Sequence, residues 1–120
     1  MKIALLFASI FFTTVASYAQ KPLLTDDEQV SEVVTQEVDA VFKSEDFLKQ
    51  KTKFFNDVSG TIVVDISVVK NGKVSTFFKV DSDIDNPKFT NFLSDYILDH
   101  KFYFKLQKQQ RYKIRYTATF

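Results

Sequence analysis

The sequence contains few side chains that could perform chemistry. Its one histidine, His100, could act as a base or as a metal ligand. It falls at the end of a predicted helix, however, where a solvated residue at the negative helix terminus is the favoured interpretation. The chain has no cysteine, so disulfides, thiol redox chemistry and a cysteine-linked lipid anchor are excluded.

Two groups of carboxylates have spacings found in functional sites. Every second residue from Asp81 to Asp85 is an aspartate, as in calcium loops, but Asn86 and Phe92 stand where such a loop needs glycine and glutamate. We favour a polar loop that caps the next helix. Asp95 and Asp99 lie one helical turn apart and could pair for acid–base chemistry, although solvated helix faces show the same spacing. We therefore predict a protein that is not an enzyme and has no catalytic residue, metal site or cofactor.

Basic and aromatic side chains alternate in the last ten residues. One face of a strand would carry Tyr112, Ile114, Tyr116, Ala118 and Phe120, and the other would carry Arg111, Lys113, Arg115, Thr117 and Thr119. The tyrosines could stack on a nucleic acid or a glycan, but apolar strand faces usually belong to the core. Cations on an edge strand could keep other strands from docking or could select an acidic, extended partner. The sequence leaves these two roles open.

Residues 1–19 have the layout of a cleavable secretory signal. Lys2 precedes an apolar run over residues 3–12, and the small residues Ser17 and Ala19 precede the expected cut. The run is well short of the roughly 20 residues that span a bilayer. We expect cleavage after Ala19, a location in the periplasm or outside the cell, and no membrane span after cleavage.

The chain after the signal has the length of one domain. Eleven phenylalanines must supply much of its core, and its fifteen basic residues balance fifteen acidic ones. This neutral composition argues against a nucleic-acid partner.

Residues 20–57 are predicted to form an N-terminal helical region. Thr25 and Glu28 have the spacing of a capping box, valines then recur with a helical period, and Ser44 can cap a second short helix. Whether the two helices fuse, and whether they cover the sheet, is left open.

Residues 58–120 are predicted to form a β-β-α-β domain. Its first strand covers residues 61–69, which alternate with apolar residues on both faces, as a central strand does. Asn71 and Gly72 predict a hairpin because both tolerate a positive φ, so residues 73–80 form the returning strand.

A helix and the last strand complete this domain. Asn86 and Pro87 predict the start of the helix, and residues 105–110 are expected to form a turn before the last strand. A right-handed crossover through the helix places the first strand between the other two. We therefore predict an α+β fold, a two-layer sandwich whose three-stranded sheet has the last strand at its edge.

Four features of residues 58–120 follow one another in a specific order. They are Ser59 and Gly60 opening an alternating strand, Val-Lys-Asn-Gly-Lys-Val over residues 69–74, the amphipathic helix after Pro87, and Phe-Tyr-Phe over residues 102–104 leading into a strand that ends with Thr119 and Phe120. In this order they resemble the C-terminal domain of the TonB energy-transducer family. In that family, an extended peptide of an outer-membrane receptor adds to the exposed edge of the last strand. The matching positions here are Arg111, Tyr112, Lys113, Ile114, Arg115, Tyr116 and Thr117.

The resemblance implies a protein–protein interaction module that binds a protein or peptide partner by strand addition. An alternative is a protein that binds a small ligand in the groove between sheet and helices, lined by Phe42, Phe47 and Phe77, with the N-terminal helix as a lid. A homodimer formed through the edge strand also stays open.

Overall fold

The computed structural model of the chain describes residues 21–120. The predicted secretory signal and its cut after Ala19 lie outside the described residues. The elements, in chain order, are β1 (Leu23–Leu24), α2 (Asp27–Lys43), α3 (Glu45–Phe54), β2 (Thr61–Val69), a 3-10 turn (Lys70–Gly72), β3 (Lys73–Ser82), α4 (Pro87–Asp99), β4 (Lys105–Leu106) and β5 (Tyr112–Thr119). The fold is therefore α+β, as predicted.

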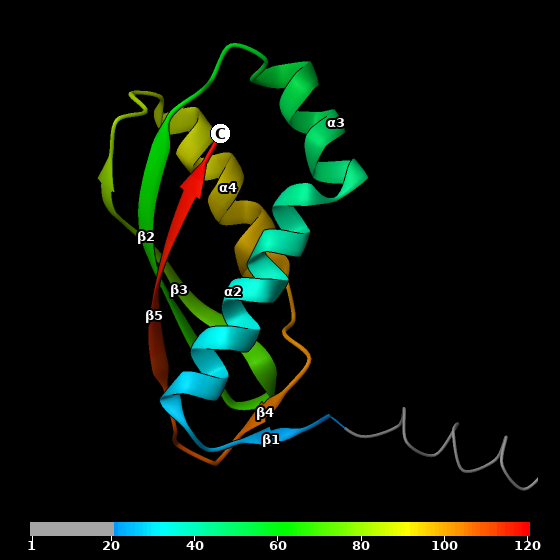
Figure 1. Cartoon of the computed structure of the whole chain (residues 1–120), viewed down its shortest axis with the longest axis vertical. Helices are drawn as coiled ribbons and strands as arrows, with labels where there is room; N and C mark the ends of the chain where they lie inside the picture. Colours follow the sequence, from blue (N-terminus) through cyan, green and yellow to red (C-terminus); the bar gives the residue numbers. More distant parts are fainter. Residues whose placement is uncertain (1–20) are drawn as a thin grey trace, which may run out of the picture.

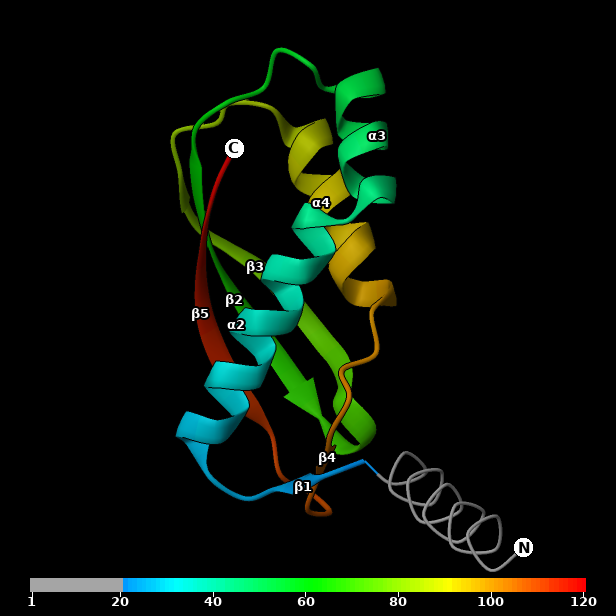
Figure 2. The ribbon, with the colours of Figure 1, turned by 45° about the vertical axis from the view of Figure 1, so that its right-hand side comes forward.

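The main sheet has three strands in the order β3-β2-β5. β2 is antiparallel to both of its neighbours, so β3 and β5 run parallel to each other at the two edges. Figures 1 and 2 show α2, α3 and α4 together on one face of this sheet. The predicted strand order, with the first long strand in the middle and the last one at an edge, is confirmed.

The alternating pattern of β2 explains its central position. Ile62, Val64, Ile66 and Val68 are buried on the face that meets the helices. On the opposite face, Asp65 and its neighbours are partly exposed and Ser67 is buried. Four β-branched side chains on one face provide a stiff apolar surface on which the helices pack.

The β2–β3 hairpin turns on two residues with a positive φ, as predicted. Asn71 has φ 67° and Gly72 has φ 73°, but the connection contains three residues rather than the two of the simplest hairpin. Gly72 is also required by packing, because a Cβ there would lie 2.2 Å from the carbonyl oxygen of Phe102. Phe102 N donates a 2.9 Å hydrogen bond to Gly72 O, which ties the hairpin to the segment after α4.

The two N-terminal helices are separate and cover the sheet. Asp26, and not the predicted Thr25, caps α2, because Asp26 is the extended residue just before the helix and accepts a hydrogen bond from Glu28 N. Ser44 has an extended conformation that ends α2, and its hydroxyl accepts from Phe47 N to start α3. The buried side chains of both helices belong to the same core as the sheet.

The start of α4 agrees with the sequence. Asn86 accepts a hydrogen bond from Phe89 N, and Pro87 occupies the first turn, where its missing N–H costs nothing. Phe89, Leu93 and Ile97 are fully buried along one side of the helix. α4 is thereby held against the core as the crossover between β3 and β5.

A small parallel sheet was not predicted. Leu23 and Leu24 pair with Lys105 and Leu106, and Lys105 N donates to Pro22 O at 2.8 Å. Residues 105–110 were expected as a turn, because a two-residue strand is too short to show alternation. The pair ties the start of the described chain to the loop before β5 (Figure 1). Between residues 21 and 120, no helix combines the length and the apolar character needed to cross a membrane.

Candidate functional site

The predicted binding residues lie along the edge strand β5. Arg111 stands one position before the strand, and Tyr112, Lys113, Ile114, Arg115, Tyr116 and Thr117 lie within it. The strand continues for two more residues, to Thr119. Among residues 21–120, β5 pairs with β2 only, so its outer side is a sheet edge.

The hydrogen bonds at the end of β5 reveal which backbone groups face outward. Gly60 N donates to Phe120 O at 3.0 Å, and Phe120 N donates to Gly60 O at 2.8 Å. In an antiparallel pair, residues that exchange both bonds alternate with residues that exchange none. The β2–β5 register has no shift, so the backbone bonds to β2 come from Phe120, Ala118, Tyr116, Ile114 and Tyr112.

The intervening residues therefore point their N–H and C=O groups away from the sheet. These residues are Lys113, Arg115, Thr117 and Thr119. Three of them are among the predicted binding residues, and Thr119 was missed because the binding positions assigned from the resemblance ended at Thr117. The other predicted strand residues, Tyr112, Ile114 and Tyr116, use their backbone to bind β2. The edge thus offers four residues to an added strand.

Only part of the basic face is free to attract a partner. Arg115 forms a bidentate pair with Asp65 of β2, with Nε–Oδ1 at 3.0 Å and Nη2–Oδ2 at 3.2 Å. This hydrogen bond lowers the pKa of the Asp65 carboxyl. Arg111 and Lys113 are exposed, and they have no ion-pair partner among the described residues. Two of the three predicted cations therefore remain available.

The aromatic face of β5 is directed at the helices. Tyr116 is 7% exposed, and its hydroxyl donates to Asp39 of α2. Burial, together with this hydrogen bond, raises the pKa of Tyr116 above that of an ordinary tyrosine. Tyr112 OH donates to Thr25 O at 3.4 Å. Both hydroxyls thus bind their own chain, and the buried ring of Tyr116 is not accessible for stacking on a nucleic acid or a glycan.

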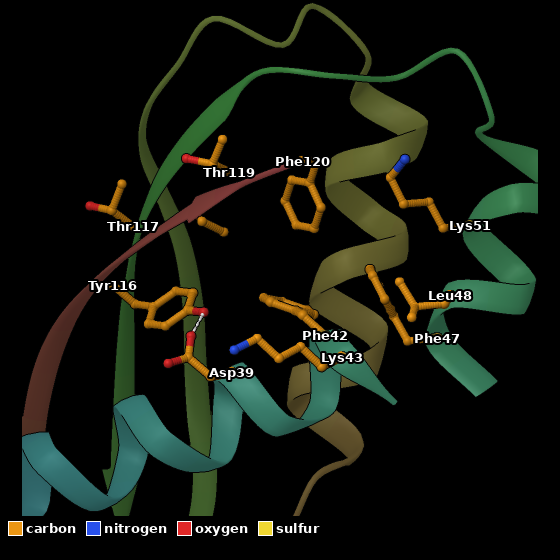
Figure 3. Close-up of a pocket in the computed structure, with 11 residues that line it drawn as sticks. Asp39, Phe42, Lys43, Phe47, Leu48, Lys51, Tyr116, Thr117, Thr119 and Phe120 are labelled. Atoms are coloured by element: carbon orange, nitrogen blue, oxygen red, sulfur yellow. Dashed lines mark hydrogen bonds between the residues drawn. The ribbon is translucent and has the colours of Figure 1, made fainter. Parts of the chain in front are cut away.

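A cavity of about 510 Å³ lies beside the second half of β5. We call it the Ala118 cavity; its apolar walls are Phe42, Phe47 and Leu48 from the helices and Tyr116, Ala118 and Phe120 from the end of the chain. Figure 3 shows Tyr116 and Phe120 directed toward this space, while Thr117 and Thr119 point away from it. The predicted groove lining is correct for Phe42 and Phe47 and wrong for Phe77, which lies on β3 at the far edge of the sheet.

A second cavity, of about 590 Å³, lies beside the first half of β5. We call it the Arg111 cavity; α2 contributes Asp27 and Ser31, and the chain from residue 110 to residue 115 forms the other wall. The edge strand is therefore accompanied by open space along both of its halves. This space is what an added strand needs for side chains that point toward the helices.

His100 has a structural contact that the sequence did not reveal. Its Nε2 lies 2.8 Å from Oε1 of Glu37, whose Oε2 accepts from Tyr103 N at 3.0 Å. The imidazole also packs edge-on against the ring of Phe102, 4.7 Å away. His100 ends α4, as predicted, but it is less solvated than expected, because α2 packs beside the end of α4 and leaves its side chain 26% exposed.

Two carboxylates of the 81–85 group accept hydrogen bonds from the backbone. Asp83 Oδ1 accepts from Thr61 N at 2.7 Å, and Asp81 Oδ1 accepts from Ser82 N at 2.9 Å. Asp95 and Asp99 lie on an exposed side of α4. Over residues 21–120, no group of three or more histidine, cysteine or acidic side chains could hold a metal ion.

Comparisons with known proteins add no assignment. The chain matches no protein-family model, no curated protein and no solved structure.

Proposed function

We propose that this protein is an exported, non-enzymatic binding module that takes up an extended peptide segment as an additional strand beside β5. The observation that carries the proposal is the outward direction of the backbone groups of Lys113, Arg115, Thr117 and Thr119. Unpaired N–H and C=O groups at a sheet edge are a template for another strand.

The surroundings of β5 favour this use of the edge. The Ala118 and Arg111 cavities lie on its helix side, so an added strand meets open space there. On the other side, the exposed Lys113 has no ion-pair partner among the described residues. A charge at this position discourages apolar strands and favours acidic ones.

The resemblance to TonB C-terminal domains indicates the class of partner. The order β2, β3, α4, β5, with β5 at the edge, is the arrangement that the resemblance implies. In the TonB family, the ligand of this edge strand is an extended segment of an outer-membrane receptor. We propose the same class of partner here, encountered in the periplasm after the signal at residues 1–19 has been removed.

The test compares two substitutions at one outward-facing position. Thr117→Pro removes an outward N–H, whereas Thr117→Val keeps that N–H and has a similar volume. Synthetic peptides from the N-terminal ends of outer-membrane receptors are titrated into ¹⁵N-labelled protein. We expect the largest amide shifts at Lys113, Arg115, Thr117 and Thr119, retained in the valine variant and lost in the proline variant. Equal binding by the two folded variants would exclude strand addition at β5.

The Ala118 cavity also supports the second candidate, a small apolar ligand held between sheet and helices. Its volume falls in the range of ligand pockets, which is about 300–1,000 Å³. In the same NMR experiment, a ligand in this cavity would shift the amide resonances of Phe42, Phe47 and Leu48, and its binding would not change in Thr117→Pro. A homodimer through β5 would instead appear as edge shifts that depend on protein concentration, without peptide.

A further inference from the structure

The chemistry of the bound segment can be derived from the same edge, on the assumption that the proposed strand addition is correct. We propose that the segment carries one bulky apolar residue, which fills the Ala118 cavity, and one acidic residue five positions away, which lies beside Lys113 on the opposite face of the sheet.

The position of the apolar residue follows from the size of Ala118. Side chains directly opposite each other on neighbouring strands lie on the same face, with Cβ atoms about 4.5–5.5 Å apart. Ala118 faces the helices between two large residues, Tyr116 and Phe120. Because its own side chain is a single methyl group, the space in front of it is left to a side chain of the neighbouring strand.

The lining of the cavity selects an apolar side chain. Phe42 is only partly buried and Leu48 is 48% exposed, so a bulky neighbour would remove apolar surface from water. Two polar groups of the lining already have partners, because Asp39 accepts from Tyr116 OH and Lys51 Nζ donates to Val58 O at 3.1 Å. Lys43, the third charged residue of the lining, is exposed, so the cavity offers mainly apolar contact area together with one accessible cation.

The acidic position follows from the charges on the other face. Of the cations there, Arg115 is neutralised by Asp65, and Arg111 and Lys113 have no ion-pair partner among the described residues. Arg111 precedes β5, so Lys113 is the one of these two that lies within the strand. On the helix side, α2 contributes the acidic Asp27 to the Arg111 cavity, whereas the basic residues of its lining, Arg111, Lys113 and Arg115, belong to the chain of the edge strand itself. An acidic residue is therefore favoured on the open face, next to Lys113.

The spacing between the two residues is set by the strand. Paired strands advance by nearly the same distance per residue, so partners of Lys113 and Ala118 are five residues apart. An odd spacing places them on opposite faces, as the lysine and the cavity require. An added strand parallel to β5 would have the acid before the apolar residue, and an antiparallel one would have it after.

A random nine-residue peptide library displayed on phage, selected on protein expressed from the full chain, provides the first test. We expect enrichment of phenylalanine, leucine or another bulky apolar residue together with Asp or Glu five positions away. Synthetic copies of the enriched peptides are then measured by fluorescence anisotropy. Replacing the apolar residue by alanine should weaken binding by about ten- to a hundredfold.

Variants of the protein locate the two contacts. Ala118→Leu fills the cavity and should weaken binding at least about tenfold. Thr76→Leu adds a similar side chain at an exposed position of β3, at the other edge of the sheet, and should leave binding unchanged. Leu48→Asp changes an exposed wall of the cavity, so it provides the same test if Ala118→Leu fails to fold. Lys113→Glu should weaken binding about two- to fivefold, with recovery when the peptide acid becomes lysine.

The outcomes separate this inference from the proposed function. No enriched peptide, or binding that survives Thr117→Pro, refutes strand addition and this inference with it. Binding that is lost in Thr117→Pro but unchanged in both Ala118→Leu and Leu48→Asp refutes the apolar contact alone. The acidic contact is refuted if the enriched peptides have no acid five positions from the apolar residue and bind Lys113→Glu as tightly as the wild type.

Discussion

Proline substitutions at neighbouring positions of β5 should differ sharply in their effect on folding. The N–H of Ala118 points toward β2, where Ile62 lies opposite, and the N–H of Thr117 points away from the sheet. Ala118→Pro therefore deletes a hydrogen bond inside the sheet and places the proline ring between two strands. Thr117→Pro deletes no hydrogen bond within the sheet, and edge positions of this kind accept proline.

The expected difference follows from the groups left without a partner. In Ala118→Pro, the carbonyl of Ile62 loses its donor beside a fully buried side chain, at a cost of about 1–3 kcal/mol. The ring between the strands adds to that cost. Thr117→Pro should cost about 1 kcal/mol or less, because only the local backbone adjusts. We therefore expect Ala118→Pro to be less stable by at least about 2 kcal/mol, out of a total of about 5–15 kcal/mol for a typical domain.

Urea unfolding followed by far-ultraviolet circular dichroism measures this difference. With a slope of about 1.5 kcal/mol per molar urea for a domain of this size, the midpoint of Ala118→Pro should lie more than about 1 M below that of Thr117→Pro. Thr117→Val is the control for loss of the threonine side chain. Equal midpoints for the two proline variants, or the reverse order, would show that the outward direction assigned to residues 113, 115, 117 and 119 is wrong.

Three further predictions concern the core and two contacts whose strength depends on pH. Phe47 is fully buried, so Phe47→Ala should cost about 3–5 kcal/mol, and a variant whose thermal midpoint equals that of the wild type would contradict the packing. Because the folded state raises the pKa of Tyr116, its bond to Asp39 should stabilise the protein fully below about pH 10 and be lost as the pH rises through the raised value. Tyr116→Phe should remove the last tyrosine to ionise in an absorbance titration and cost about 1 kcal/mol at neutral pH; an unchanged titration would argue against the contact. Arg115→Ala should raise the lowered pKa of Asp65. In the wild type, the stability that this pair contributes is lost as the pH falls from the unfolded-state pKa, near 3.9, through the lower folded-state pKa, and this loss should be smaller in the variant. Carboxyl NMR titration measures this pKa, and equal values in the two proteins would exclude the pair.

Most elements could be predicted because their signals are local. The alternation over residues 61–69, the helix caps at Ser44 and Asn86, and the positive φ of Asn71 and Gly72 depend on residues within a few positions of each other. Topology followed as well, since a strand, a hairpin and a crossover helix leave few arrangements. The location of β5 at the sheet edge was therefore predictable.

Contacts between distant segments could not be predicted. Glu37 and His100 are 63 residues apart, and the pairing of residues 23–24 with 105–106 has too short a strand at each end to leave a pattern. The place of Phe77 was also wrong, because alternation indicates which face of β3 a residue occupies but not which helix lies above it. Such contacts depend on how whole elements dock.

The sequence by itself determined the helices, the three long strands and their order, and the basic and apolar faces of β5, because each is encoded in short-range periodicity and turn chemistry. Only the tertiary structure decided which backbone groups of β5 are free, since that depends on the mutual hydrogen bonds of Gly60 and Phe120. It also decided that α3 stands far enough from Ala118 to leave a cavity. Both properties depend on register and on distances between elements, which a one-dimensional pattern does not contain.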